Sequence, residues 1–171
     1  MVFATLDDEE EKEVLRLSRF YWQEAKRCEK AKAYLAGCVM LGSALETFLM
    51  LMVNLFEDEA SQTGKIPMRR GQPKPLLEWN LAELLGVAKA ANWLPAALDP
   101  NDGWNGRRAR TGDYAEVVRQ LRNLAHPARY REDLFGKRFT GKYLRMQFRF
   151  MLLCRNWLAD RNNRSPLGRA R

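Results

Sequence analysis

The 171-residue sequence contains one histidine, three widely separated cysteines and no Cys-x-x-Cys pair. A structural zinc site normally needs four Cys or His ligands, so we expect no bound metal. The sequence also lacks a glycine-rich phosphate loop, which argues against nucleoside-triphosphate chemistry, so no cofactor is expected. An odd number of dispersed thiols is typical of a reducing compartment, and the expected location is the cytoplasm.

Strand patterns are missing as well, because no segment alternates apolar and polar residues over a strand's length. The length fits one domain, 1–171, with a core at about 7–160 and a basic tail at 161–171. The pattern predicts an all-α, up-and-down helical bundle of about five helices. Their expected ranges are about 7–27, 28–56, 76–92, 112–127 and 141–162, with Thr5 as the first N-cap.

One predicted helix is apolar on nearly every side. Residues 33–56 carry a single charge, Glu46, and are long enough to cross a membrane. Polar residues interrupt the run and Glu46 would lie near its middle, which favours a central core helix and no membrane association. A buried carboxylate needs a partner, so we expect Glu46 to pair with Arg122 or, second, Arg119. The alternative is that Glu46 reaches solvent at the edge of the bundle.

Charge is distributed unevenly along the chain. Residues 1–60 contain 12 acidic and 7 basic residues, whereas residues 61–171 contain 9 acidic and 22 basic residues. Such asymmetry suggests a surface that faces a polyanion, most plausibly a nucleic acid, although a solvated basic face would give the same composition.

The predicted helix at 112–127 places polar groups opposite its apolar face. Arg119, Arg122, Asn123 and His126 fall within an arc of roughly 100°. Arginine forks bind phosphate oxygens, and a histidine near neutral pH can exchange a proton with a ribose hydroxyl or a leaving oxygen. These four residues are therefore the candidate catalytic group. The alternative is that His126-Pro127 merely ends the helix.

Two stretches resemble HEPN (higher eukaryotes and prokaryotes nucleotide-binding) domains. They are Leu121–Pro127, which resembles the family's Arg-Asn…His motif, and Leu41–Glu46, which is similar to its long second helix. The resemblance covers about Asp7 to Leu158. It implies a helical bundle that forms a homodimer, and a metal-independent endoribonuclease or RNA-binding module of defence or toxin–antitoxin systems. By this resemblance Arg122, Asn123 and His126 are the motif residues. Three residues separate Arg122 from His126, fewer than in active members, which favours binding over cleavage.

Basic residues recur in two further places. Arg138, Lys142, Arg145 and Arg149 are spaced by 4, 3 and 4 residues, which aligns them on one helix face that could follow RNA phosphates. Arg107, Arg108 and Arg110 lie near Trp104 in a turn-rich segment and could clamp a single strand. Both features are equally typical of solvated basic surfaces.

Two functions follow from these patterns. The first is a HEPN-like RNA-associated protein that binds RNA or a partner. In a stronger version of this hypothesis the protein also cleaves RNA without a metal. The second is a non-catalytic helical module that binds a partner protein from the same operon, with Arg and His of the motif in structural roles.

Overall fold

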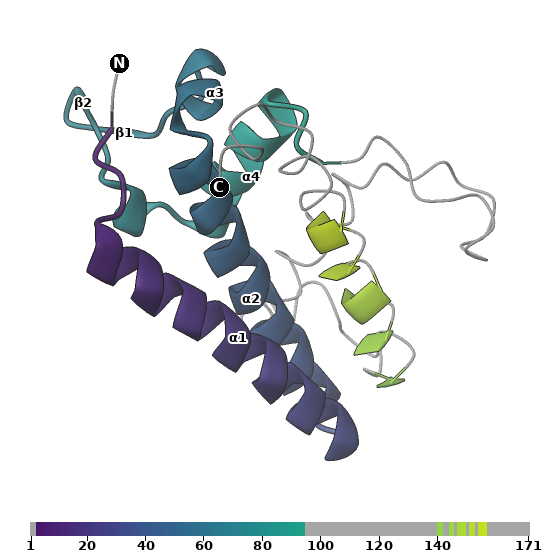
Figure 1. Cartoon of the computed structure of the whole chain (residues 1–171). Coiled ribbons are helices and arrows are strands. Elements are labelled where there is room, and N and C mark those ends of the chain that lie inside the picture. The colour runs from purple at the N-terminus through teal and green to yellow at the C-terminus, as the bar shows by residue number, and fades with distance from the viewer. Residues whose placement is uncertain are drawn as a thin grey trace, which may run out of the picture.

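The computed structural model describes residues 3–94, 140–141, 144–145, 147–149, 151–152 and 154–156. Of these described residues, 72% are helical, and the only strands among them form one two-stranded hairpin. The protein is therefore an all-α helical bundle, as the sequence predicts. Figure 1 shows its two long helices, α1 and α2, running antiparallel beside each other.

Helix α1 spans Asp8–Lys30 and begins at a reciprocal cap. The Asp7 carboxylate accepts hydrogen bonds from the backbone amides of Glu9 and Glu10 at 2.9 Å, and the Glu10 side chain accepts one from the Asp7 amide at 3.0 Å. The expectation that Thr5 is the N-cap is therefore wrong. Asp7 takes this position because a glutamate follows it three residues later and completes the capping box.

The turn between α1 and α2 lies later in the chain than expected. α1 continues to Lys30 and α2 spans Tyr34–Leu55, so the predicted helix start near residue 28 is wrong. Lys32 has a φ of 58°, its amide donates to the Glu29 carbonyl, and the Ala33 amide donates to the Cys28 carbonyl. This is a Schellman ending built without glycine, so the residue that usually marks such an ending is missing from the sequence.

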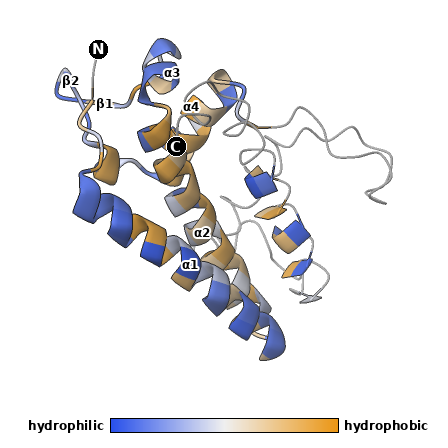
Figure 2. Ribbon diagram, in the orientation of Figure 1, coloured by the Kyte–Doolittle hydropathy of each residue, from blue (hydrophilic) through white to orange (hydrophobic). Residues whose placement is uncertain are grey.

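Helix α2 forms the centre of the core. Leu41, Leu45, Leu49 and Val53 recur every four residues and are fully buried, and Figure 2 shows α2 as a mostly apolar ribbon. By length and composition α2 could cross a membrane, yet 61% of its most apolar window is buried within the protein. Its buried face packs against α1 and α4, so α2 has the core position expected for it.

A short segment with little regular structure connects α2 to α4. It contains α3 (Glu57–Gln62), the antiparallel strands β1 (Met68–Arg69) and β2 (Gln72–Pro73), and the 3-10 helix η1 (Leu76–Glu78). The expectation of no strands is wrong here, because two residues per strand are too few to give an alternating pattern. The hairpin turns through Arg70 and Gly71, whose φ angles are 51° and 80°.

Helix α4 spans Leu81–Ala90, so the single helix predicted at 76–92 is divided in two. Trp79 is extended, and Asn80 then caps α4 by accepting from the Glu83 amide at 3.0 Å while Glu83 accepts from the Asn80 amide at 2.8 Å. The leucines of η1 continue the apolar spacing of α4, which hides this break in the sequence. The following Trp93 is fully buried and donates its indole N–H to Glu59 at 2.8 Å.

Helical residues described between 141 and 156 are called the C-terminal helix below. Leu144, Gln147, Met151 and Cys154 form its buried face. A Cβ atom added to Gly37 would lie 2.7 Å from Leu144 Cδ2, so the missing side chain of Gly37 allows this helix to approach α2 closely. The close contact places the C-terminal helix beside the α1–α2 pair (Figure 1). An adjacent face of this helix lines a groove with α1.

Candidate functional site

Most of the predicted site residues lie outside the described residues, and three do not, namely Arg145, Arg149 and Glu46. Arg145 and Arg149 are described, and both are exposed on the C-terminal helix. The residues outside are the candidate catalytic group, the other basic candidates and the tail: Arg119, Arg122, Asn123, His126, Arg107, Arg108, Arg110, Arg138, Lys142 and 161–171. Their predicted roles stay predictions.

The carboxylate of α2 has a defined position. Glu46 is half-buried on this mostly buried helix. Its proposed partners, Arg122 and Arg119, lie outside the described residues, so the predicted ion pair stays a prediction.

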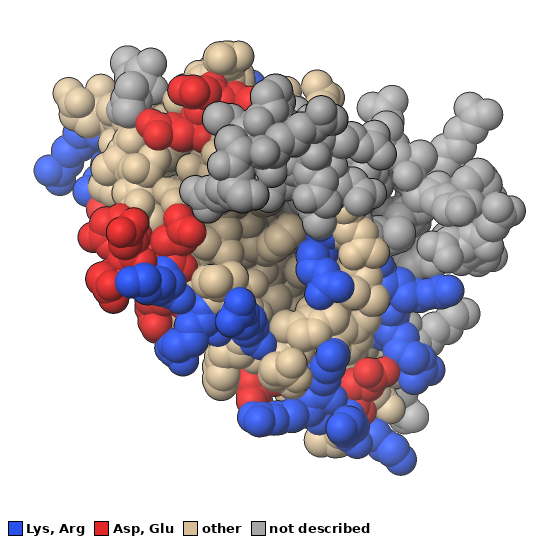
Figure 3. Space-filling model, in the orientation of Figure 1, with Lys and Arg blue, Asp and Glu red and all other residues tan. Residues whose placement is uncertain are grey.

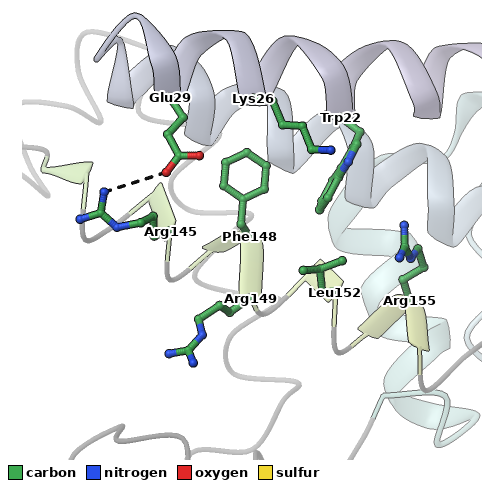
Figure 4. Close-up of a pocket in the computed structure, with 8 residues that line it drawn as sticks. All are labelled: Trp22, Lys26, Glu29, Arg145, Phe148, Arg149, Leu152 and Arg155. Carbon is green, nitrogen blue, oxygen red and sulfur yellow. Dashed lines mark ion pairs between the residues drawn. The ribbon is translucent and has the colours of Figure 1, made fainter.

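A groove of about 570 Å³ lies between α1 and the C-terminal helix (Figure 4). This volume falls within the range of about 300–1,000 Å³ that is typical of ligand sites. Eight residues line it, and they carry four cations, one carboxylate, two aromatic rings and one leucine. They are Trp22, Lys26, Glu29, Arg145, Phe148, Arg149, Leu152 and Arg155.

Helix α1 contributes one wall of the groove. Trp22, Lys26 and Glu29 are spaced by four and three residues, which places them on one helix face. Trp22 and Glu29 are half-buried and Lys26 is exposed. The wall is therefore aromatic at one end, cationic in the middle and acidic at the other end, where α1 approaches its final turn.

The C-terminal helix contributes the other wall. Arg145, Phe148, Arg149, Leu152 and Arg155 repeat at spacings of three, one, three and three, which forms one continuous face. Phe148 and Leu152 are half-buried toward α1, whereas the three arginines are exposed. Arg145 and Arg149, the described members of the predicted basic stripe, thus line one side of a groove. On this wall the aliphatic and aromatic groups are more buried than the guanidinium groups.

An aromatic pair joins the two walls. The rings of Trp22 and Phe148 have centroids 5.2 Å apart and planes at 87°, an edge-to-face arrangement that is favourable for aromatic rings. Lys26 Nζ lies 5.5 Å from the centroid of the Trp22 ring, and Arg155 Cζ lies 6.0 Å from it. Two cations are thus held close to one indole by cation–π attraction.

The charge of the groove is strongly positive. Its one carboxylate, Glu29, lies 4.0 Å from Arg145 Nη1, at the outer limit of an ion pair. The two side chains are 34% and 66% exposed, so the pair contributes little to stability. Figure 3 shows basic side chains on both rims of a hollow, and acidic side chains gathered toward the N-terminal part of α1. The groove is therefore suited to a negatively charged ligand.

Half of this groove was missed by sequence reasoning. Trp22 and Phe148 pack against the core and also line the groove, and no motif in the sequence indicates this second role. Lys26 and Arg155 were not singled out at all. Arg155 extends the face of Arg145 and Phe148 by further helical turns, which is a signal that the spacing contained. The pairing of that face with α1 is tertiary and has no signal in one sequence.

The part of the chain that the structure describes contains neither a cluster of metal ligands nor a cysteine with a lowered pKa. Within it, no three His, Cys, Asp or Glu residues gather as metal ligands would. Burial raises the pKa of the Cys38 and Cys154 thiols to about 12, and burial followed by the nearby Glu24 raises the pKa of Cys28. A nucleophilic thiol needs a lowered pKa, so none of these three cysteines is suited to catalysis.

Comparison with known proteins adds no assignment. No family model, no curated protein and no solved structure matches the chain. The function is therefore argued from the groove and from the sequence motifs.

Proposed function

We propose that this protein is a HEPN-like RNA-associated protein that binds single-stranded RNA in the groove between α1 and the C-terminal helix. The observation that carries the proposal is that four cations line the same groove as an aromatic pair, two of them, Lys26 and Arg155, beside the Trp22 ring. Lysine and arginine bind phosphate oxygens, and aromatic rings stack on unpaired bases regardless of sequence. The two features together are characteristic of single-strand binding.

The shape of the groove favours a single strand over a duplex. A duplex keeps its bases stacked inside and offers mainly phosphates to a protein, so it would leave Trp22 and Phe148 without a ligand ring. An unpaired nucleotide can bring its base against these rings while Arg145, Arg149 and Arg155 contact the flanking phosphates. The groove is open to solvent along its length and has a volume of about 570 Å³, so a strand could enter it from the side.

The resemblance to HEPN domains extends the proposal to cleavage. In that form the protein is a homodimer, Arg119 and Arg122 hold the scissile phosphate, and Asn123 orients them. His126 takes the proton of the attacking 2′-hydroxyl or donates one to the leaving oxygen, without a metal. The groove would then deliver the strand to this group. Binding is the primary proposal, because it rests on described residues and because the spacing from Arg122 to His126 is short.

The alternative is a non-catalytic module whose groove takes an acidic segment of a partner protein. The cations would serve such a partner equally well. The aromatic pair supports RNA, because stacking on a planar base uses its ring faces and an aspartate or glutamate side chain does not.

Binding is tested with a fluorescein-labelled 10-nucleotide RNA of mixed sequence and its pre-formed duplex, by anisotropy at several salt concentrations. Arg149→Ala removes a groove cation, and Trp22→Leu removes the stacking ring. Lys12→Ala is the charge-matched control, because Lys12 is exposed near the acidic start of α1 and pairs with Glu9 at 2.7 Å.

The wild type is expected to prefer the single strand. Trp22→Leu should weaken binding about fivefold or more, since stacking on one aromatic is worth about 1–3 kcal/mol. Arg149→Ala should reduce the slope of log K against log salt by about 0.7. Absence of single-strand binding by the wild type, or equal losses in Lys12→Ala and Arg149→Ala, would contradict the proposal.

Cleavage is tested separately, by incubating the same RNA with excess chelator and comparing the wild type with His126→Ala. Products that appear only with the wild type support the ribonuclease form. No cleavage by either protein, together with retained binding, leaves an RNA-binding protein without this activity.

A further inference from the structure

Glu29 is an unusual residue for a groove that binds a polyanion. It is the one carboxylate among the eight lining residues, and it lies one turn beyond Lys26 on the same face of α1. A negative charge beside a phosphate path repels phosphates and lowers affinity. Its presence therefore needs a reason other than general RNA binding.

Stability does not supply that reason. Within the described residues, the Glu29 carboxylate contacts one cation, Arg145, at 4.0 Å. On the same helix, Glu13 and Arg16 form an ion pair at 2.6 Å with two hydrogen bonds. The Glu29 pair is thus loose, and the carboxylate keeps its capacity to accept hydrogen bonds from a ligand.

The position of Glu29 relative to the aromatic pair is informative. In the view of Figure 4, Phe148 lies between Glu29 and Trp22, and the carboxylate of Glu29 points toward the C-terminal helix. Glu29 therefore stands at one end of the aromatic pair. A base that stacks against these rings would direct one of its edges toward that end of the groove.

We propose that Glu29 makes the groove selective for guanine in single-stranded RNA, an inference that rests on the proposed RNA binding. A carboxylate has two acceptor oxygens and no donor. Guanine presents two adjacent donors, N1–H and the N2 amino group, and can satisfy both oxygens at once. Adenine and cytosine each place a ring acceptor beside their amino group, and uracil has a single N–H between two carbonyls. Single-stranded RNA is commonly recognised through such base edges.

Arg145 links base recognition to phosphate binding. When guanine takes both oxygens of Glu29, the loose contact with Arg145 is replaced, and the guanidinium becomes available to a phosphate of the same nucleotide. The groove then offers stacking, a bidentate base contact and a phosphate contact to one guanosine. The other bases receive stacking and phosphate contacts as well, but each can bring only one donor group to the Glu29 carboxylate, and an acceptor lies beside that donor.

The test uses labelled 7-nucleotide oligouridylates that differ only in the central base: uracil, adenine, cytosine, guanine or inosine. Inosine keeps the N1–H of guanine and lacks its amino group. The proteins are the wild type, Glu29→Gln and Glu24→Gln. Glu24 is the matched control, a half-buried carboxylate on α1 that pairs with Arg27 and does not line the groove.

The wild type and Glu24→Gln are expected to bind the guanine oligonucleotide at least about fivefold more tightly than the uridine one, with inosine between them, since one bidentate base contact discriminates by about 1–3 kcal/mol. Glu29→Gln should lose this preference and bind oligouridylate as well as the wild type or better, because a repulsive charge is gone. A merely structural role of Glu29 would instead change the affinity for all five oligonucleotides by the same factor.

Three results would overturn the inference, and they are distinguishable. Equal affinity of the wild type for all five oligonucleotides refutes guanine selectivity and leaves RNA binding intact. A guanine preference that persists in Glu29→Gln refutes the role of Glu29. No binding of any oligonucleotide refutes the proposed function and this inference together.

Discussion

Replacing Gly37 by alanine is expected to destabilise the protein even though alanine is the better helix former. Inside α2 the change removes a glycine penalty of about 1 kcal/mol. The new Cβ, however, would lie 2.7 and 3.0 Å from the two methyl carbons of Leu144 and 3.3 Å from Cys28 Cβ. Ordinary carbon contacts are about 3.5–4.0 Å, and Leu144 is fully buried, so it has little room to retreat.

The magnitude follows from these two opposing effects. Overpacking of a closed core costs about 1–3 kcal/mol, so the net change for Gly37→Ala is a destabilisation of about 0–2 kcal/mol. Gly86→Ala in α4 is the matched control, because no described atom beyond the helix's own nearby backbone lies within 4 Å of a Cβ added there. It should stabilise by about 0.5–1 kcal/mol. For a chain of this length the Tm values of the two variants should differ by roughly 1–12 °C, Gly37→Ala being lower.

The assay is thermal and urea unfolding followed by far-ultraviolet circular dichroism, with Leu144→Ala as the third variant. Leu144→Ala alone should cost about 2–5 kcal/mol. In its background Gly37→Ala should become stabilising, which gives a coupling energy of at least about 1 kcal/mol. If Gly37→Ala stabilises as much as Gly86→Ala and shows no coupling to Leu144, the C-terminal helix does not pack on α2 as described, and the groove is lost with it.

Three further changes have defined outcomes. Cys28 should react first with a disulfide reagent at pH 8, more slowly than a free thiol because its pKa is raised, while Cys38 and Cys154 stay protected until unfolding; Cys28→Ser should remove the early phase. Asn54→Ala should destabilise by about 1–2 kcal/mol in urea unfolding, since its amide holds both the N-terminal segment and α1 through 2.8 Å hydrogen bonds. Arg70→Asn should stabilise by about 0.5–1 kcal/mol in the same assay, because asparagine tolerates the left-handed turn position better; an unchanged or lower stability would contradict the hairpin geometry.

The sequence predicts the helices better than their ends. The long apolar run of α2 and the amphipathic α1 identify both helices, because burial dictates their composition. Their boundary was misplaced because the chain reverses at Lys32, where the usual glycine is missing. The division between η1 and α4 was missed for a related reason, since Asn80 caps a new helix inside an unbroken apolar pattern. Caps depend on single side-chain hydrogen bonds, which periodicity does not register.

One wall of the groove could be predicted from the sequence, and the other wall could not. Arg145 and Arg149 lie on one helix, so their spacing alone places them on one face. Trp22 and Lys26 belong to a helix near the other end of the chain, and only tertiary packing brings them opposite. The spacing of Trp22 and Lys26 on α1 is that of an ordinary amphipathic helix, so it does not by itself indicate a site. A site built from two distant segments needs the fold before its members can be grouped.

A groove built from two distant segments would tie the proposed RNA binding to the stability of the fold. A ligand that contacts α1 and the C-terminal helix together binds only the docked arrangement, so it stabilises that arrangement in proportion to its concentration over its Kd. Gly37 lies against Leu144, and neither residue is among the eight that line the groove. A loss of affinity in Gly37→Ala that Leu144→Ala partly restores would therefore arise from docking, whereas a loss in Glu29→Gln confined to guanine would arise from contact. Comparing these two variants therefore distinguishes residues that hold the two helices together from residues that contact the RNA.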